Sequence, residues 1–355
     1  MDCRRSIRIL FLADTHLGFD YPIRPRIQRR RRGHDFFANY QQALSAVSAE
    51  RIDFVIHGGD VFFRSKVPQA IVVRAFEPLI ELADGGIPVY IVPGNHERSK
   101  IPESLFSLHN NIYIFDRPTT FCPEINGIRI GLSGFPYVRD NIRKNFPRVL
   151  HTIREHAASA EQSDIRVLCM HQIVEGARIG VYDYVFRSGG EVIRSADIPG
   201  DIDLVLSGHI HRYQILRSGL DGKNLNAPVF YPGSIDRTSF AERNEVKGYL
   251  ILEISMSGNP RRSTVSHQFI PLPTRPMVSF DIDAGMLTPE NALAMLGDLL
   301  KGQNPDSVVR ISFRGSVPDG VRARLTAQNI RDLSPSSMNV TLSFPERFAH
   351  SDGML

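Results

Sequence analysis

The chain has 355 residues, enough for one large domain and a smaller appended one. Hydrophobic residues make up 42% of it and charged residues 23%, which excludes a disordered or fibrous chain and indicates a globular protein. The net charge of +4 and the isoelectric point near 9.0 suit a polyanionic partner but are too mild to establish one. Cys3, Cys122 and Cys169 are scattered and odd in number, which argues against a disulfide framework and favours a reducing compartment.

The amino-terminal residues contain a short apolar run that predicts a buried strand. Only Ile9 to Ala13 is uninterrupted and Asp14 follows at once, which does not fit a signal peptide. No apolar stretch approaches the roughly 20 residues that cross a bilayer. We therefore expect a cytoplasmic protein without a membrane partner.

Several short apolar runs along the chain end in a polar cluster. Runs this short and rich in Val, Ile and Leu are typical of buried strands, and they occupy residues 7–13, 54–56, 89–92, 167–170 and 204–206. Helical patterns at residues 36–50 and 69–83 separate some of them, so we predict a layered α/β fold. Ligands bind at the carboxyl ends of strands in such sheets, and we expect the polar clusters to meet at one site.

The pattern changes after Gly248. Residues 249–254 predict a strand, and residues 269–276 resemble an extended linker. The next elements are predicted to be strand, helix, strand, helix and strand, at residues 277–282, 289–301, 308–313, 320–328 and 338–344. We therefore expect a catalytic domain over residues 1–270, a small βαβαβ domain over 277–345 and a tail over 346–355.

The polar clusters contain the residue types that hold a pair of divalent metal ions. Two such ions about 3.5–4 Å apart lower the pKa of a bridging water and clamp a phosphate, which is what phosphodiester hydrolysis requires. The clusters are Asp14-Thr-His16, Gly59-Asp60, Gly94-Asn95-His96, His171 and Gly208-His209-Ile-His211. This mixture of carboxylate, amide and imidazole suits manganese, iron or zinc, and the absence of thiolates from it argues against a structural zinc site.

Spacing within the clusters supports convergence. Side chains two apart on an extended backbone point to the same side, which we expect for Asp14 with His16 and for His209 with His211. The preceding glycines permit sharp turns and close backbone approach. Each cluster alone is more often a turn, a cap or a core histidine than a site, but all five in order at successive strand ends favour one metal centre.

The ordered series resembles the calcineurin-like metallophosphoesterases. Within them, His16-Leu17-Gly18 and Tyr231-Pro232-Gly233-Ser234 are similar to motifs of the SbcD-type DNA double-strand-break-repair nucleases. The resemblance implies a layered α-β-β-α sandwich with a small C-terminal α+β capping domain. It also implies two metal ions, manganese first and iron or zinc as alternatives.

The resemblance assigns roles to eight residues. It implies one ion held by Asp14, His16, Asp60 and His211, and the other by Asp60, Asn95, His171 and His209. Asp60 would bridge the two ions. His96 would be the catalytic acid that protonates the leaving oxygen, a task that suits an imidazole at neutral pH.

Two positions depart from the family pattern. Glu97 replaces the usual aspartate after Gly-Asn-His, and we expect it to orient His96 and to lie near the substrate. Phe63 stands where the family tends to carry a histidine or aspartate, which removes a polar neighbour of the substrate. That change puts exonuclease behaviour in doubt but not metal binding.

The densest charge in the chain lies between Arg24 and His34. Arg29, Arg30, Arg31 and Arg32 are therefore candidate contacts to a DNA backbone, which would make affinity fall with salt. A solvated or interface loop is an equally good interpretation of such a run. Arg237 and Arg243 are further candidates for the same face.

The resemblance also implies protein partners. A homodimer interface in that family uses helices near residues 36–47, whose apolar spacing fits either such a face or packing on the chain's own sheet. The SbcC-like ATPase partner of the family docks through helices after the capping domain. Only about ten residues follow the last predicted strand here, so we expect the usual docking region to be absent.

We expect a metal-dependent DNA nuclease, exonuclease or endonuclease, that acts in DNA repair. The alternative is a phosphodiesterase or phosphatase for a small nucleotide or phosphorylated substrate. A non-enzymatic binding scaffold should have lost ligands, whereas this sequence retains every one.

Overall fold

The computed structural model describes residues 5–20, 29–97, 109–155, 162–256 and 263–345. These fall into two compact units. The larger unit contains the described residues of 1–21 and 33–274, and the smaller contains those of 22–32 and 275–355. Residues 29–32 thus pack with the small unit, although they lie within the range predicted for the catalytic domain.

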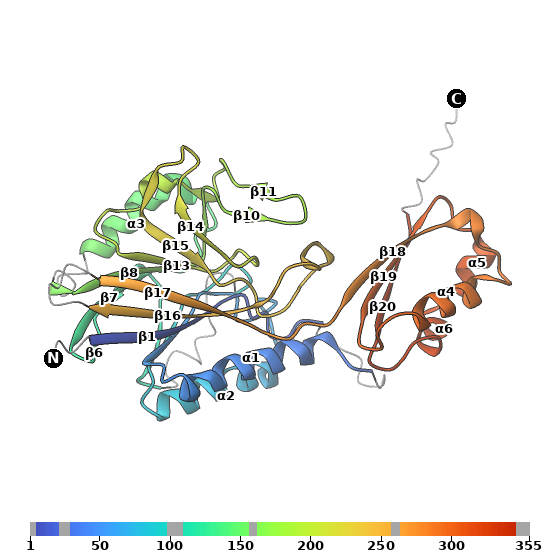
Figure 1. The fold of residues 1–355 in the computed structure, drawn as a ribbon, viewed down its shortest axis with the longest axis horizontal. Helices are drawn as coiled ribbons and strands as arrows, with labels where there is room; N and C mark the ends of the chain where they lie inside the picture. Colours follow the sequence, from blue (N-terminus) through green and yellow to red (C-terminus); the bar gives the residue numbers. More distant parts are fainter. Residues whose placement is uncertain (1–4, 21–28, 98–108, 156–161, 257–262, 346–355) are drawn as a thin grey trace. The chain divides into compact units, whose positions relative to one another are not determined.

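Two sheets form the centre of the larger unit (Figure 1). The first has the order β17-β16-β1-β2-β3-β4, in which β1 to β4 are parallel and β16 and β17 antiparallel. Its strands are β1 (Arg5–Leu12), β2 (Phe54–His57), β3 (Val89–Ile91), β4 (Ile112–Ile114), β16 (Gly248–Met256) and β17 (Ser263–Pro271).

The second sheet has the order β14-β15-β13-β8-β7-β5, with β6 paired to β7. Its four central strands, β15, β13, β8 and β7, are parallel. The bounds are β5 (Thr119–Phe121), β6 (Glu124–Ile125), β7 (Ile128–Gly134), β8 (Ile165–Met170), β13 (Leu204–Ser207), β14 (Gln214–Ser218) and β15 (Asn224–Tyr231).

The period of two along buried strands builds the layers. In β1, Ile7, Ile9 and Phe11 face the core between the two sheets. Leu10 and Leu12 face the opposite way, into a core shared with α1 (Arg32–Ala49) and α2 (Gln69–Asp84). On the outer face of the second sheet, a third core includes α3 (Ile142–Glu155). The helices therefore cover both outer faces (Figure 1), which confirms the predicted α-β-β-α sandwich.

The apolar face of α1 is covered by the chain itself. Phe36, Phe37, Tyr40 and Leu44 are at most 4% exposed and belong to the core between the helices and the first sheet. Of the two interpretations of this face, packing on the chain's own sheet is therefore the one observed. The prediction of a homodimer interface formed by these side chains is wrong, because a face buried within the chain is not available to a partner.

Short elements connect the main strands. Two small sheets pair β9 (Ile173–Val174) with β12 (Val192–Ile193) and β10 (Arg178–Ile179) with β11 (Tyr184–Val185). The 3-10 turns η3 (Ser195–Asp197) and η4 (Phe240–Glu242) follow. Among the described residues, every helix is too short or too polar to pass through a lipid bilayer.

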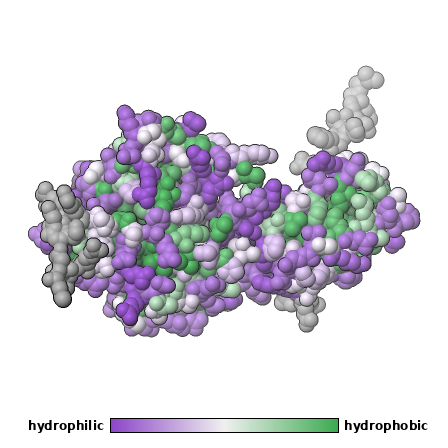
Figure 2. All heavy atoms as spheres, viewed as in Figure 1, coloured by the Kyte–Doolittle hydropathy of each residue, from purple (hydrophilic) through white to green (hydrophobic). Residues whose placement is uncertain are grey.

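The small unit is built on a parallel three-stranded sheet, β18-β19-β20. Phe280 and Ile282 of β18 pack with Val309 and Ile311 of β19 against the helices, whereas the intervening positions are mostly polar. Figure 2 shows hydrophobic residues at the visible surface of this unit, bordered by hydrophilic ones. The elements are β18 (Met277–Asp283), η5 (Ala284–Met286), α4 (Ala292–Lys301), β19 (Val308–Arg314), α5 (Asp319–Arg324), α6 (Ala327–Asp332) and β20 (Asn339–Ser343).

One predicted helix of the small unit is divided into two. The sequence predicts a helix over residues 320–328, but α5 ends at Arg324 and α6 begins at Ala327. Thr326 accounts for the break, because its side chain accepts a hydrogen bond from the Asn329 amide and so caps a new helix.

Arg29 is part of the structure of the small unit. Its guanidinium donates to the carbonyls of Met338 (2.8 Å), Ser334 (3.0 Å) and Pro335 (3.1 Å), and also to that of Arg331. Two of these carbonyls lie at or just beyond the end of α6, where helical carbonyls lack partners and attract a cation. The predicted contact of Arg29 with DNA is therefore wrong, since its donors are used within the protein.

Replacing Arg29 with alanine should loosen the small unit. Losing these charged hydrogen bonds is expected to cost about 1–2 kcal/mol and to speed amide exchange in β19 and β20 roughly 5- to 30-fold. Hydrogen exchange followed by mass spectrometry measures this. Lys301→Ala, at an exposed ion pair on α4, is the control and should change stability by less than about 0.5 kcal/mol. Equal exchange in both variants would contradict the structural role.

Candidate metal centre

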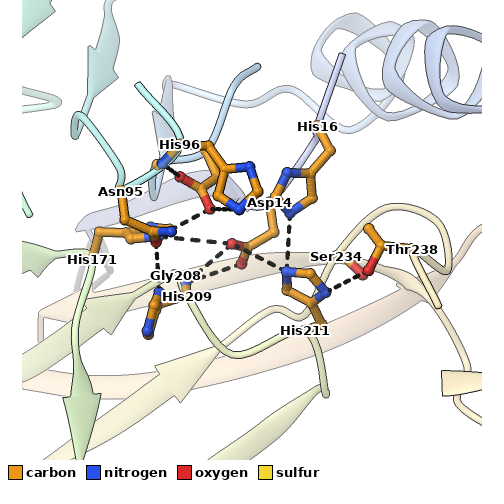
Figure 3. A network of polar contacts seen from close by, with 12 residues as sticks. Asp14, His16, Asn95, His96, His171, Gly208, His209, His211, Ser234 and Thr238 are labelled. Atoms are coloured by element: carbon orange, nitrogen blue, oxygen red, sulfur yellow. Dashed lines mark hydrogen bonds and ion pairs between the residues drawn. The ribbon is translucent and has the colours of Figure 1, made fainter. Parts of the chain in front are cut away.

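The candidate ligands lie at the carboxyl ends of strands in both sheets. Asp14 and His16 follow β1, Asp60 follows β2, and Asn95 follows β3. From the second sheet, His171 follows β8, and His209 and His211 follow β13. The sheets face each other across a common core, so the loops from both meet at one end of the larger unit, and the seven side chains surround one centre (Figure 3).

The backbone at these ligands is not extended. Asp14 (φ 51°), His16 (φ 44°), Asp60 (φ 53°) and His209 (φ 80°) have left-handed conformations. The predicted extended geometry of the Asp-x-His and His-x-His pairs is therefore wrong, although both pairs do face the centre. Such conformations are costly for side chains other than glycine and occur where the surrounding structure enforces them, often at functional sites.

Hydrogen bonds between loops enforce this conformation. The amides of Asp14, His16 and Leu17 donate to the carbonyls of Gly59, Asp60 and Val61, at 2.9, 3.0 and 2.8 Å. The loop after β1 is thus joined to the loop after β2 residue by residue. As a result these hydrogen bonds fix the positions of Asp14, His16 and Asp60 relative to one another.

Two glycines make room for the ligands themselves. A Cβ at Gly94 would lie 2.1 Å from Oδ1 of Asp60, and one at Gly59 (φ +105°) would lie 2.3 Å from Nδ1 of His171. Neither distance is compatible with a side chain. We expected these glycines to permit close approach of the backbone. Their lack of a side chain leaves the space that the neighbouring candidate ligands, Asp60 and His171, occupy.

One group of donors comprises Asp14, His16 and His211. The Nε2 atoms of the two imidazoles lie 2.9 Å apart, and that of His211 lies 3.9 Å from Oδ1 of Asp14. The Asp14 carboxylate also accepts the His209 amide at 3.1 and 3.2 Å. Asp14 and His16 are fully buried, so these groups are withheld from bulk water.

A second group of donors comprises Asp60, Asn95, His171 and His209. Nε2 of His171 lies 3.4 Å from Oδ2 of Asp60 and 3.0 Å from Oδ1 of Asn95. Nδ1 of His209 lies 2.8 Å from the same Asn95 oxygen. The two groups are contiguous, because Asp14, Asp60 and His171 offer ligand atoms within 4.8 Å of one another.

Hydrogen bonds from the protein decide which ring nitrogens face the centre. Nδ1 of His171 contacts the Gly58 carbonyl at 2.7 Å, and Nδ1 of His211 contacts Oε1 of Glu242 at 3.2 Å. Both partners are acceptors, so both Nδ1 atoms carry the proton. In the neutral rings this leaves the Nε2 lone pairs directed at the carboxylates, which is the arrangement of metal-ligating histidines.

The electrostatics of the centre show a shortage of positive charge. Burial raises the pKa of Asp14 to about 6, against the attraction of His171 and His211. Burial also acts to raise the pKa of Asp60, but the charge and hydrogen bond of His171, together with the charges of His16 and His96, outweigh it and the net shift is downward. Burial likewise acts to lower the pKa of His171, but the carboxylates of Asp60 and Asp14 and the hydrogen bond to Gly58 together raise it. A proton on His171 thus provides positive charge that a divalent cation would supply instead.

The donor set fits divalent cations. The Nε2 atoms of His16 and His211 lie 2.9 Å apart, and Glu242 holds the proton of His211 on the far nitrogen, so the Nε2 lone pair of His211 faces the centre and could bind a cation. Nδ1 of His16 is buried and has no hydrogen-bond partner among the described residues. Mixed oxygen and nitrogen donors of this kind suit manganese, iron or zinc.

His96 lies at the open side of the centre. Its Nδ1 contacts the Phe63 carbonyl at 2.6 Å, and its Nε2 lies 3.9 Å from Oδ2 of Asp60. The side chain is 34% exposed, compared with 0% for His171. The Phe63 ring packs 5.7 Å from that of His96 and 5.9 Å from that of His16. The Phe63 ring is thus an apolar neighbour of the His96 imidazole. The imidazole is partly exposed, so a substrate could reach it.

Glu97 does not have the predicted role. It is 4% exposed, and its two oxygens accept the amides of Phe62 (2.7 Å) and Gly94 (2.8 Å). Burial, followed by the charge of Asp60, raises its pKa to about 8. Glu97 therefore joins the loops after β2 and β3, and the predictions that it orients His96 or touches the substrate are wrong.

Other residues support the centre and escaped the sequence motifs. The buried His57 contacts Oγ1 of Thr15 at 3.0 Å and accepts the Gly59 amide at 3.2 Å, which fixes both loops around Asp60. The ring of Tyr137 lies 5.4 Å from that of His209. His57 left one signal in the sequence: it is a polar residue in an otherwise apolar strand. Arg237, a candidate DNA contact, instead donates to the Glu245 carbonyl.

Comparison with known proteins identifies the family. The profile of the calcineurin-like phosphoesterases matches residues 7–213, more than half of the chain. This range contains all seven candidate ligands and His96. The chain belongs to the calcineurin-like phosphoesterase family, whose members are metal-dependent hydrolases of phosphate esters.

Relatives within this family are DNA double-strand break repair proteins named Mre11. The chain is 25% identical over 313 residues to that of Methanosarcina acetivorans, covering 88% of this chain and 46% of the relative. It is 25% identical over 248 residues to that of Methanococcus maripaludis, with coverages of 68% and 60%. For Saccharolobus solfataricus the identity is 28% over 251 residues, with coverages of 68% and 57%. The chain spans about half the length of the curated relatives it matches.

Binding of metal should stabilise the larger unit. A cation that binds only the folded chain at 100 times its dissociation constant adds about 2.7 kcal/mol to the free energy of unfolding. We therefore expect the melting temperature to rise on titration with Mn²⁺ and to fall again with a chelator. Asp60→Ala, which removes the carboxylate shared by both donor groups, should abolish most of this rise. A melting temperature indifferent to Mn²⁺ in the wild-type chain would contradict a metal centre.

Proposed function

We propose that this chain is a metal-dependent DNA nuclease of double-strand-break repair, which hydrolyses phosphodiester bonds as an exonuclease or endonuclease. One observation carries the proposal. Five strand ends bring two carboxylates, an amide and four imidazoles around one centre, in a chain similar over 88% of its length to a DNA repair protein. Manganese is the proposed metal.

The two donor groups define two cation positions. We assign Asp14, His16 and His211 to one position, and Asn95, His171 and His209 to the other. Asp60 would be shared by both positions, which its place between His16 and His171 supports. When bound, the two cations supply a bridging water of lowered pKa and neutralise the charge of the phosphate.

The chain's own residues supply the rest of the chemistry. The carbonyl of Phe63 holds the proton of His96 on Nδ1, which leaves Nε2 facing the centre, 3.9 Å from Oδ2 of Asp60. In its imidazolium form, His96 carries a second proton on Nε2, which it donates to the leaving oxygen. Phe63 limits the access of water to this imidazole, since its ring covers one side of it.

DNA binding is proposed from the similarity and the charge pattern. Arg30 lies 3.5 Å from Asp306 in the small unit, so at most part of its charge serves a substrate. From the charge pattern alone, Arg30, Arg31 and Arg32 are the proposed contacts to backbone phosphates, which would make affinity decrease with salt. A homodimer through another surface and an SbcC-like ATPase partner remain proposals from the resemblance.

The substrate class can be decided directly. Wild-type protein with Mn²⁺ should shorten or nick end-labelled linear and single-stranded DNA, and a panel of mononucleotides and simple phosphate esters should react more slowly. Product formation is compared at equal phosphate concentration, with Asp60→Ala as the inactive control. Activity confined to the small substrates would reject the nuclease and favour a small-molecule phosphoesterase.

Replacing His96 with alanine should separate metal binding from proton transfer. Turnover is expected to fall by about 10²–10⁴-fold, because the leaving oxygen loses its proton donor. The metal content, measured by elemental analysis, should match that of the wild-type chain. A variant that loses its metal along with its activity would show that His96 is a ligand.

A further inference from the structure

A chain of buried charges lies directly behind His211. Nδ1 of His211 contacts Oε1 of Glu242 at 3.2 Å, and the other Glu242 oxygen lies 2.7 Å from Nζ of Lys247. Lys247 also contacts Glu245 at 2.8 Å and donates to the His211 carbonyl at 2.8 Å. Its side chain is fully buried, and those of Glu242 and Glu245 are 10% exposed.

The Glu242 carboxylate is fixed from several sides. Oγ1 of Thr238 donates to its Oε1 at 2.6 Å, and Oγ of Ser239 donates to the same oxygen at 3.2 Å. The Thr238 amide and Lys247 hold the second oxygen, at 3.3 and 2.7 Å. Figure 3 shows Thr238 next to His211, on the side of the ring away from Asn95 and His171. Both oxygens of the carboxylate are therefore held, and the one that contacts Thr238 and Ser239 is also the one that meets Nδ1 of His211.

Stability alone does not explain these charges. Removing a lysine and two glutamates from water carries a large desolvation penalty, and apolar side chains of similar volume often stabilise a fold as well or better. A buried carboxylate on the outer nitrogen of a histidine has a different effect. It fixes the ring's tautomer and orientation and increases the electron density at the inner nitrogen.

We propose that Glu242, held in place by Lys247 and Thr238, is a positioning residue that sets the cation affinity of His211. The inference deepens the proposed function and rests on its metal centre, not on its substrate. It concerns one of the two cation positions. The corresponding nitrogen of His171 contacts a neutral carbonyl, that of Gly58, so the two positions differ in how strongly their imidazoles are polarised.

The outer end of the same network offers a matched control. Nε of Arg212 contacts Glu245 at 3.2 Å, and its other nitrogens contact Asp183 and the Gly180 carbonyl in the β10–β11 hairpin. The Asp183 side chain is 63% exposed. Asp183→Asn removes the same charge as Glu242→Gln from the same network, but at a residue that does not touch His211.

The test is a calorimetric titration of the metal-free full chain with Mn²⁺. In Glu242→Gln, one of the two ions should bind about 10- to 100-fold more weakly, the range seen when partners of metal ligands are removed. The other ion should bind as in the wild-type chain. Thr238→Val should weaken the same ion by a smaller factor, and Asp183→Asn should weaken neither. Circular dichroism establishes that each variant is folded.

Three results would overturn the inference: unchanged affinities in Glu242→Gln, equal weakening of both ions, or the same weakening in Asp183→Asn. If Glu242→Gln does not fold, Thr238→Val decides on its own, because it keeps all the charges. The titration needs no substrate. A wild-type chain that binds two ions yet leaves DNA intact would therefore reject the nuclease and not this inference, whereas one that binds no Mn²⁺ would reject both.

Discussion

Asp14 and Asp60 lie fully or almost fully buried beside each other, at the end of the larger unit where strands of both sheets finish. Two carboxylates in this position repel each other and lose their hydration, so the protein must surround them with positive charge or with donors. The amides of His209 and His96 donate to them, and four imidazoles approach them. Three of the imidazoles, those of His171, His96 and His211, in turn have an acceptor on the outer nitrogen.

These acceptors belong to residues outside the set of candidate ligands. A backbone carbonyl serves His171, another serves His96, and a buried carboxylate with its own lysine serves His211. The loops that carry them are joined by Glu97 and His57, neither of which faces a substrate. The geometry of the centre therefore depends on residues from several loops at this end of the sandwich, and not on the candidate ligands alone.

The convergence of the candidate ligands could be predicted because they follow apolar strands in a fixed order, and strand ends converge in layered α/β folds. What escaped prediction depends on partners far away in the sequence. Arg29 finds its carbonyls about 300 residues later, and Glu242 reaches His211 across 31 residues. Periodicity showed that α1 has an apolar face but not that the chain's own sheet covers it. The local sequence pattern also suggested an extended backbone at Asp14. Hydrogen bonds with the neighbouring loop impose a left-handed conformation there instead.

The left-handed backbone at Asp14, His16, Asp60 and His209 has a consequence for how this chain can evolve. Each such position disfavours a side chain by about 1 kcal/mol or more, a strain that glycine does not suffer. Selection for thermostability alone would therefore tend to replace the candidate metal ligands at these positions. Keeping four such residues at one centre therefore carries a cost in the stability of the folded state.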